Sequence, residues 1–321
     1  MRKLMAVLLA ALAVLGPRAT EAKDLAMARA VKVTTLSTML ADEGLGEWGY
    51  SALVEVDGRK VLFDSGANPD VVLHNARAMG IDLSDVEDVI ISHFHDDHTG
   101  GLMTLRKALM AKNPKSLSRL HVGEGIFAPR FEKDGKPANT FPMLADAFRA
   151  SGGQVIVHAV PTEIVPGAWL TGPVPRHHAE TNWNPGLMMD EGGKRVADYL
   201  PEDSSLVMPT AQGSVIVTGC GHAGIMNIAD AAQAMTGNEP LLAVIGGVHL
   251  FAKPDAVLVE TAARLKGLRY LLGGHCTGIE ATVRLRELLA LDRHTAVVAA
   301  VGSRFVLGKG IDAGMIAGWA G

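Results

Sequence analysis

The stretch that decides the fold is the ten-residue run Ser92-His93-Phe94-His95-Asp96-Asp97-His98-Thr99-Gly100-Gly101. It follows the apolar stretch 86–91, which is typical of a buried strand, and it precedes Leu102, Leu105 and Leu109, whose spacing predicts a helix. Three imidazoles and two carboxylates within six positions suit Zn²⁺ or another first-row metal better than Ca²⁺ or Mg²⁺. The run therefore predicts a metal site at the turn between a strand and a helix.

The sequence before this run predicts a β-hairpin and a helix. Three strands are predicted, over Lys32–Leu36, Ser51–Val56 and Lys60–Phe63. Asp57-Gly58 is a strong two-residue turn between the second and third of these strands. A helix is predicted from Asn68-Pro69 to Met79, and a strand over Val86–Ile91 leads into the histidine run. Antiparallel strands that give way to alternating helix and strand indicate an α/β fold.

The device of a buried strand followed by a histidine recurs three times downstream. The strands and their histidines are Ser214–Val217 with His222, Leu241–Ile245 with His249, and Tyr270–Leu272 with His275. Helices are predicted over Ile225–Met235 and Asp255–Leu268. One histidine after a strand is more often structural than a ligand, but four such strand ends favour a shared site.

His93, His95, Asp97 and His98 match the His-x-His-x-Asp-His hallmark of the metallo-β-lactamase superfamily, which this sequence resembles. The resemblance implies an α/β fold, a four-layer αβ/βα sandwich with metals at the loop ends of two facing sheets. It also implies that Asp64, in Phe63-Asp64-Ser65-Gly66, orients a metal-ligating histidine and is not itself a ligand.

Further motifs resemble one branch of that superfamily, which contains the dihydropterin-methyl-ribofuranosylaminobenzene phosphate synthase of methanopterin biosynthesis. The similarity covers roughly 31–306 and rests on five motifs, which are Glu47-Trp48-Gly49-Tyr50-Ser51, Gly172-Pro173-Val174-Pro175-Arg176, Gly219-Cys220-Gly221-His222, Gly246-Gly247-Val248-His249-Leu250 and His275-Cys276-Thr277-Gly278. Together these motifs are more specific than the general hallmark.

The sequence departs from the superfamily at the bridging aspartate, where it has Thr218-Gly219-Cys220. Cys220 could ligate as a thiolate, stay a small buried thiol, or leave the role to His222, which we favour. His177-His178 are the nearest candidates for the usual third histidine, although a polar loop is the preferred interpretation. Arg176 could clamp an anionic substrate or form a surface ion pair.

The resulting hypothesis assigns two groups of metal ligands and two catalytic residues. His93, His95 and His222 would hold one metal, and Asp97, His98 and His275 a second. Zn²⁺, one or two ions, is the favoured metal, with Mn²⁺ or Fe²⁺ as alternatives. Asp97 would also orient the nucleophile, and His249 would contact substrate or transfer a proton, unless it is a structural histidine. A shared site would also bring Cys220 and Cys276 together.

Composition and the N-terminal sequence limit the expected partners, domain organisation and location of the protein. The chain of 321 residues is 48% hydrophobic with a formal net charge of −4, which gives no reason to expect nucleic acid as a partner. A basic start and the apolar run after it predict a signal peptide over 1–22, a single domain over 23–321, and a periplasmic or secreted protein with no stable membrane anchor after cleavage.

These features favour an exported metal-dependent hydrolase that uses a metal-bound hydroxide on an unidentified small molecule, with an anionic substrate left open. One alternative is a metal-assisted enzyme resembling the pterin/ribosyl-phosphate synthase, which fits poorly with export. Another is a non-catalytic periplasmic metal-binding protein. The absence of the bridging aspartate, whose place Cys220 takes, supports this alternative. Substrate choice is expected to lie in the long region 113–205, which includes Trp169 and Trp183.

Overall fold

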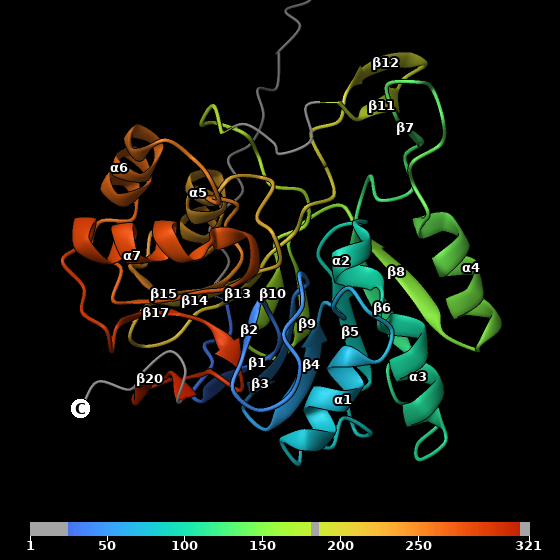
Figure 1. Ribbon diagram of the computed structural model, residues 1–321, viewed down its shortest axis with the longest axis horizontal. Helices are drawn as coiled ribbons and strands as arrows, with labels where there is room; N and C mark the ends of the chain where they lie inside the picture. The colour runs from blue at the N-terminus through green and yellow to red at the C-terminus, as the bar shows by residue number, and fades with distance from the viewer. Residues whose placement is uncertain (1–24, 181–185, 315–321) are drawn as a thin grey trace, which may run out of the picture.

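The computed structural model describes residues 25–180 and 186–314, and two large β-sheets dominate this part of the chain (Figure 1). The first sheet has the strand order β20-β19-β1-β3-β4-β5-β6-β8. Its strands are β20 (Gly310–Asp312), β19 (Arg304–Val306), β1 (Val31–Ser37), β3 (Ser51–Val56), β4 (Arg59–Phe63), β5 (Asp88–Ile91), β6 (Arg119–Gly123) and β8 (Gln154–His158).

The second sheet has the strand order β17-β16-β15-β14-β13-β10-β9. Its strands are β17 (Ala296–Val298), β16 (Tyr270–Gly273), β15 (Leu241–Gly246), β14 (Ser214–Thr218), β13 (Leu206–Met208), β10 (Ala168–Leu170) and β9 (Thr162–Val165). Two smaller sheets add β12 (Lys194–Ala197), β11 (Met188–Glu191) and β7 (Arg130–Phe131), and β18 (Ala300–Val301) with β2 (Leu40–Ala41).

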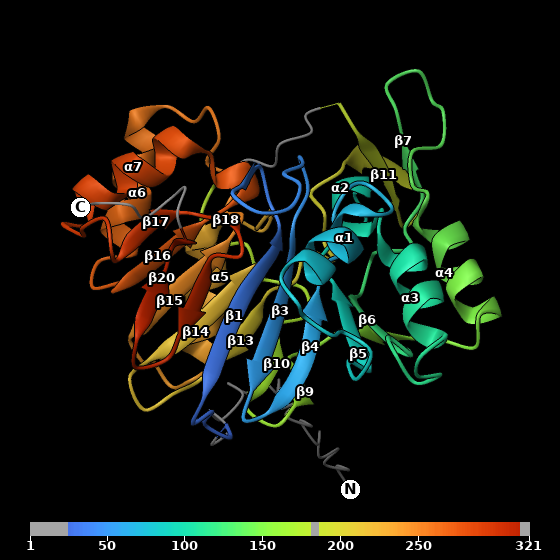
Figure 2. The same ribbon diagram turned by 60° about the horizontal axis from the view of Figure 1, so that its bottom comes forward.

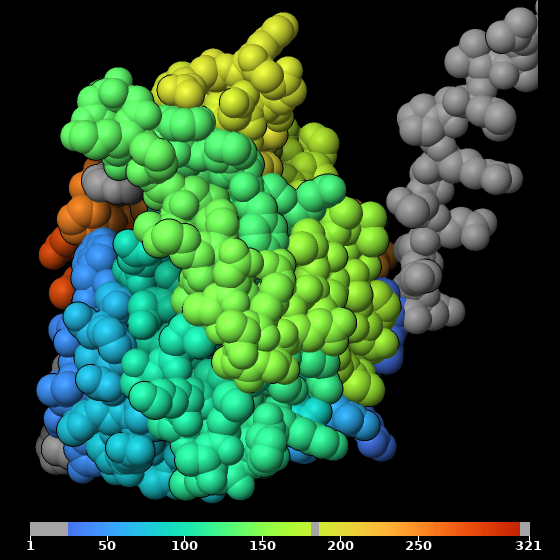
Figure 3. All heavy atoms as spheres, turned by 90° about the vertical axis from the view of Figure 1, so that its right-hand side faces the viewer, coloured from blue at the N-terminus to red at the C-terminus, as the bar shows by residue number. Residues whose placement is uncertain are grey.

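Helices cover the outer face of each large sheet (Figures 1 and 2). The first sheet carries α1 (Val71–Ala78), α3 (Leu102–Met110) and α4 (Phe141–Ala150), and the second carries α5 (Ile225–Met235), α6 (Asp255–Arg264) and α7 (Ile279–Leu288). The short helix α2 (Asp96–Thr99) and the 3₁₀ turn η1 (His275–Thr277) lie in loops. Figure 3 shows the face of the molecule on which the green and yellow-green middle of the chain lies at the surface.

Three apolar cores separate the layers, and alternation along the strands explains them. Val215 and Val217 of β14 face the core between the two sheets, while Ile216 faces the core under α5. On the other side, Leu62 of β4 faces the core under α1 and α3, while Val61 and Phe63 face the second sheet. Helix, sheet, sheet and helix form a four-layer αβ/βα sandwich, which confirms the predicted fold class.

Local predictions hold at the hairpin and fail at three element ends. Val56 pairs with Arg59 across a two-residue turn in which Asp57 and Gly58 both have positive φ, as the sequence predicted. Helix α1 begins at Val71, three residues late, because the Asn68 backbone and side-chain amides both donate to Glu47 and hold that residue in a turn.

The other two differences also have local causes. Strand β5 begins at Asp88 and not at Val86, whose amide closes a turn with the Leu83 carbonyl. Helix α6 ends at Arg264 and not at Leu268, because Gly267 takes a φ of +93° that no right-handed helix contains.

Parallel strands in each sheet end at the same edge of the molecule, and this edge positions the candidate site. Strands β4, β5, β6 and β8 are parallel, as are β14, β15, β16 and β17. The histidine run follows β5, and His222, His249 and His275 follow β14, β15 and β16. Ligand sites of α/β proteins form beyond such carboxyl ends, so both sheets contribute to one place.

Two predictions concern the chain ends and the membrane. None of the helices within 25–180 and 186–314 has the length and apolar character that crossing a bilayer requires. The signal peptide predicted over 1–22 lies outside the described residues, and the single domain over 23–321 stays a prediction.

Candidate metal centre

The loop after β5 carries the first ligands and is fixed by close backbone packing. A Cβ at Gly100 would lie 1.8 Å from the Ala67 carbonyl oxygen, and one at Gly101 would lie 2.2 Å from the Ser65 carbonyl oxygen, so only glycine fits at both positions. The Gly-Gly pair after the histidines thus lets the loop pack against the turn after β4. His93 is fully buried, and its Nε2 lies 3.0 Å from Nδ1 of His95.

Asp64 orients His98, as the resemblance implied. Its buried carboxylate accepts from the Ser92 amide at 2.7 Å and contacts His98 Nδ1 at 2.7 Å. Because an ionised carboxylate only accepts, Nδ1 of His98 carries the hydrogen and Nε2 is left to face the site. A small hydrogen-bonded network thereby sets the ring's direction.

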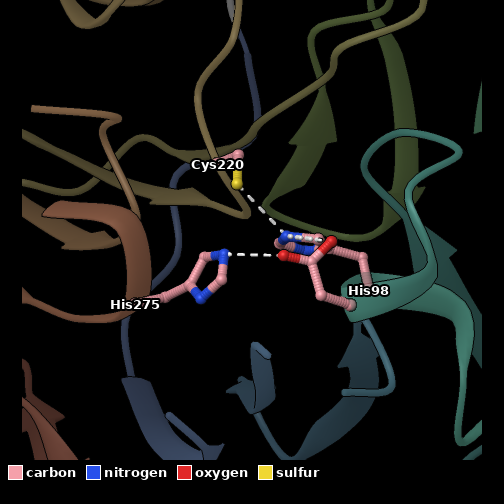
Figure 4. Close-up of side chains that lie close together, drawn as sticks. His98, Cys220 and His275 are labelled. Carbon is pink, nitrogen blue, oxygen red and sulfur yellow. Dashed lines mark hydrogen bonds and ion pairs between the residues drawn. The ribbon is translucent and has the colours of Figure 1, made fainter. Parts of the chain in front are cut away.

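The second sheet supplies the opposite wall through the loops after β14 and β16. Figure 4 shows Cys220 and His275 converging with His98 from separate loops. The Cys220 sulfur lies 3.2 Å from His98 Nε2, and His275 Nε2 lies 3.3 Å from Asp97 Oδ2. His275 has a φ of +47°, and its amide donates to Thr38 Oγ1 at 2.9 Å, which ties this strained residue to the loop that follows β1.

The predicted ligands form two groups that share Cys220. Within each group the ligand atoms lie within 4.8 Å of one another; the groups are Asp97, His98, Cys220 and His275, and His93, Cys220 and His222, while His93, His95 and Asp97 form an overlapping third. The six ligands predicted from sequence therefore lie in one cluster, and Asp97, His98 and His275 group as predicted, whereas His95 groups with His93 and Asp97 and not with His222. The Cys220 sulfur belongs to both groups, so it lies within reach of both predicted ions together with His222.

His222 fits a metal ligand by its surroundings. The residue is 3% exposed, and both ring nitrogens are buried without a hydrogen-bond partner among the described residues. Such orphaned nitrogens are costly unless something binds them. Burial and the neighbouring imidazoles lower the pKa of His222 and of His93 well below the ordinary value, and burial lowers the pKa of His95 to about 4. All three are thus neutral at pH 7, as metal ligation requires.

Charge is concentrated at Asp97 and His98. Burial opposes ionisation of both, but His98 and His275 lower the pKa of Asp97, and Asp97 with Asp64 raises the pKa of His98 to about 9. Binding a cation here would release the His98 proton and replace one positive charge with another. The donor set of imidazoles, a carboxylate and a thiol suits a divalent first-row metal.

A cavity of about 340 Å³ opens above these groups. Its lining consists of Trp48, His95, Asp97, Cys220, His222, His249, Phe251, His275 and Cys276. His249 lines it as predicted, with its ring centroid 4.6 Å from that of His222, and it also groups with Cys220 and Cys276 within 4.8 Å. The two cysteines are buried free thiols in one neighbourhood, as expected of a shared site.

Several residues considered from sequence lie elsewhere. Arg176 donates to the carbonyl oxygens of His222, Tyr199 and Leu200, so its guanidinium braces a ligand loop and does not line the cavity. The amides of His177 and His178 donate to Asn227, and neither ring lines the cavity, in keeping with a polar loop.

The residues that line the cavity differ from the prediction that the region 113–205 determines substrate choice. No residue of the described part of 113–205 lines the 340 Å³ cavity, although Ala179 and Glu180 line a smaller adjoining cavity of about 80 Å³. Trp183 lies outside the described residues. Phe251 was missed, and no sequence signal marks it beyond its place two residues after His249.

The fold and the ligand arrangement define a class, and comparison with known proteins agrees. The family model of the metallo-β-lactamase superfamily matches residues 49–182. In this matched region, which is less than half of its length, and in its fold, the chain resembles the metallo-β-lactamase superfamily.

Its similarities within that class point to two kinds of chemistry. It is 29% identical over 265 residues to the 7,8-dihydropterin-6-methyl-4-(β-D-ribofuranosyl)-aminobenzene-5′-phosphate synthase of Methanocaldococcus jannaschii, covering 78% of this chain and 89% of that protein. It is also similar to the solved structure of a metal-dependent hydrolase of the β-lactamase superfamily, with a TM-score of 0.65 and 28% identity over 85% of this chain and 98% of that one. The metallo-β-lactamase fold protein YhfI of Bacillus subtilis shares the fold, with a TM-score of 0.55 and 13% identity over 86% and 99% of the two chains.

Proposed function

We propose that this protein is an exported hydrolase that depends on divalent metal, Zn²⁺ in preference to Mn²⁺ or Fe²⁺, and acts on a small molecule. The observation that carries the proposal is the pair of ligand groups that meet at Cys220 on the floor of a 340 Å³ cavity. His93, His95, His222 and Cys220 would hold one ion, and Asp97, His98, His275 and Cys220 the other. When bound, the metals would supply Lewis-acid polarisation and a water of lowered pKa.

The protein's own groups have separate tasks in this scheme. Asp97, whose side chain is 24% exposed, keeps one carboxylate oxygen 3.3 Å from His275 Nε2 and presents its charge to the cavity. In the proposed scheme Asp97 orients the attacking water and accepts its proton. His249 lies on the cavity wall, where an imidazole can donate a proton to the leaving group.

A second candidate function follows from the similarity to the synthase of Methanocaldococcus jannaschii. In that case the same metal groups would assist a condensation on a pterin or ribosyl-phosphate substrate, and the protein would act in the cytoplasm. A protein recovered from the cytoplasm of its source cells with Met1 retained would favour the synthase. N-terminal sequencing of protein from the cell envelope fraction, with a start near residue 23, would support export.

Metal content is the first test. The purified chain, supplemented with Zn²⁺, Mn²⁺ or Fe²⁺, is expected to retain one to two ions per chain after desalting. His95→Ala should lose metal and show a lower thermal midpoint in metal than the parent, because bound ligand stabilises the native state by mass action. The matched control is His294→Ala, which removes an exposed histidine outside the site. Equal metal loss in both variants would contradict the ligand assignment.

Turnover is the second test. Phosphodiesters, phosphomonoesters, lactones, thioesters and β-lactams are offered to the metal-loaded and the chelated protein. Hydrolysis of one class that requires metal and is abolished in His98→Ala supports the proposal. Stoichiometric metal binding with no turnover of any class would favour the non-catalytic metal-binding protein.

A further inference from the structure

Two large aromatic side chains at the mouth of the cavity are partly exposed to solvent, although burial would stabilise an apolar side chain. Trp48 is 48% exposed and Phe251 is 43% exposed, and both line the cavity. Their ring centroids lie 5.6 Å apart with an interplanar angle of 71°, so the rings form a corner. The Trp48 ring centroid is 5.0 Å from that of His275, which places the corner directly beside the ligand groups.

The chain holds Trp48 in this position through its two neighbours. Glu47 is 8% exposed, and its carboxylate accepts from Ser37 Oγ at 2.6 Å and from the Asn68 amide at 2.8 Å. A Cβ at Gly49 would lie 2.6 Å from the Ala67 nitrogen and 2.9 Å from the Asp97 carbonyl oxygen. A buried anchor on one side and a tightly packed glycine on the other restrain the backbone at Trp48, which lowers the cost of ordering it on binding.

Phe251 is fixed in a similar way to the other wall. Its amide donates to the carbonyl oxygen of Cys276 at 3.0 Å, next to His275. Gly278 also lies against Phe251, because a Cβ built at Gly278 would be in ordinary van der Waals contact with it at 3.4 Å. Both aromatic residues are therefore tied to loops that carry predicted ligands.

The charge of the cavity narrows what can bind. Among the described residues the lining contains one carboxylate, Asp97, and no lysine or arginine. Selectivity for the part of a substrate that lies away from the metals therefore rests on the two rings. A planar ring fits a corner of this kind, because it can lay its face on one aromatic and its edge on the other.

We propose that Trp48 and Phe251 form a subsite for a planar aromatic ring that is attached to the group being hydrolysed. This inference rests on the proposed function, whose substrate class it narrows. The ring could belong to a nucleobase, a pterin or a simple aryl group, which share the flat π-surface that the corner recognises.

Three phosphonates, which carry a methyl group, a saturated ring or an aromatic ring, test the subsite on the metal-loaded full-length protein. Benzylphosphonate is expected to bind about fivefold to tenfold more tightly than methylphosphonate in calorimetry, with cyclohexylmethylphosphonate in between. Trp48→Ala and Phe251→Ala should each remove this preference while methylphosphonate affinity and metal content stay within twofold of the parent. Trp48→Phe should keep most of it. Met143→Ala, which alters an exposed apolar side chain on α4, is the control that should change nothing.

A second arm separates failure of the subsite from failure of the proposed function. Benzyl alcohol, which needs no metal, should quench tryptophan fluorescence more than cyclohexylmethanol does, and Trp48→Phe should abolish the difference. Equal affinities of the three phosphonates, or a preference that survives in both alanine variants, would overturn the subsite even in an active hydrolase. A ring preference in the alcohols, combined with no phosphonate binding and no turnover, would uphold the subsite and reject the metal-dependent hydrolase.

Discussion

At the scale of single residues, Cys220 determines how this site differs from its superfamily. It takes the place of the expected bridging aspartate and belongs to both ligand groups. A thiolate is a softer and larger ligand than a carboxylate, and it suits Zn²⁺ and other thiophilic ions. If the thiol ligates in place of the carboxylate, the expected result is a stronger preference for such ions.

Cobalt substitution can test this role. The Co²⁺-loaded protein should show a sulfur-to-metal charge-transfer band in the near ultraviolet, and Cys220→Ala should abolish it and weaken metal binding by more than about tenfold, the lower end of the effect of losing an outer-shell partner. Cys276→Ala is the matched control and should keep the band. Cys220→Asp should lose the band but retain two ions. A band that survives in Cys220→Ala would exclude this thiol as a ligand.

His249 gives a second residue-scale prediction. His249→Gln should lower kcat on any substrate found by roughly 100-fold, the usual effect of losing a general acid, while metal stoichiometry stays unchanged. Its backbone φ of +50° is unusual for a histidine, and glutamine preserves the side chain's polarity there. Atomic absorption and steady-state kinetics on the same preparation provide the measurement. Loss of one ion would instead make His249 a ligand together with Cys220 and Cys276.

At the scale of elements, the segment 198–205 joins the ligand loops of the two sheets. The Ser204 amide donates to the Ser92 carbonyl oxygen at 3.1 Å, and the Asp203 carboxylate accepts from the Ala223 amide at 2.7 Å. Arg130 of β7 anchors this segment through Asp198 and Glu202, all three being buried. The Arg130 guanidinium also lies 4.5 Å from the ring centroid of Phe94, which separates His93 from His95.

Removing this arginine should cost much of the molecule's stability. Arg130→Met removes the guanidinium that the buried Asp198 and Glu202 carboxyl groups share and should lower the free energy of unfolding by about 3–5 kcal/mol. Arg149→Met, which removes an exposed arginine paired with Asp146, should cost less than about 1 kcal/mol. Urea denaturation of the chelated proteins gives both values. A loss in Arg130→Met no larger than in Arg149→Met would show that the network does not hold the segment.

At the scale of the whole molecule, Glu202 should make stability depend on pH. Burial raises the pKa of Glu202 to about 7 from 4.5, although Arg130 opposes the shift. Between these two values the native state holds a proton that the unfolded chain has lost, so the free energy of unfolding falls as the pH rises through this window, by at most about 1.4 kcal/mol per pH unit.

Denaturation midpoints at pH 5, 6, 7 and 8 in chelator would measure this slope. Glu202→Gln removes the titrating group but keeps a hydrogen-bonding side chain, so its curve should be flatter than that of the parent over this range. Identical slopes in the two proteins would mean that Glu202 is ionised throughout.

The sequence predicted the site better than its surroundings, for physical reasons. Each ligand directly follows a buried strand, and parallel strands end at one edge, so local patterns were enough to gather His93, His95, Asp97, His98, His222 and His275. The fold class came from the same motif through family resemblance, because alternation of strands and helices alone is compatible with many α/β folds.

What the sequence could not predict depends on contacts between distant segments. Arg130, Asp198 and Glu202 carry no local signal, since a buried ion pair looks like surface charge until the fold brings its partners together. The late start of α1 has the same origin, because Glu47, 21 positions away, competes for the Asn68 amide. Phe251 reads as one more apolar residue until its exposure at the cavity mouth is known.

The division of ligands between the two sheets also bears on how the protein folds. His98 meets Cys220 across 122 positions of sequence, and the His275 amide meets Thr38 across 237. Forming such a contact closes a long loop, which costs conformational entropy, and contacts this far apart in sequence therefore form slowly. Both proposed ion sites draw ligands from both sheets, so each is completed only when the two sheets dock, and bound ions are expected to stabilise the last stage of folding more than its beginning.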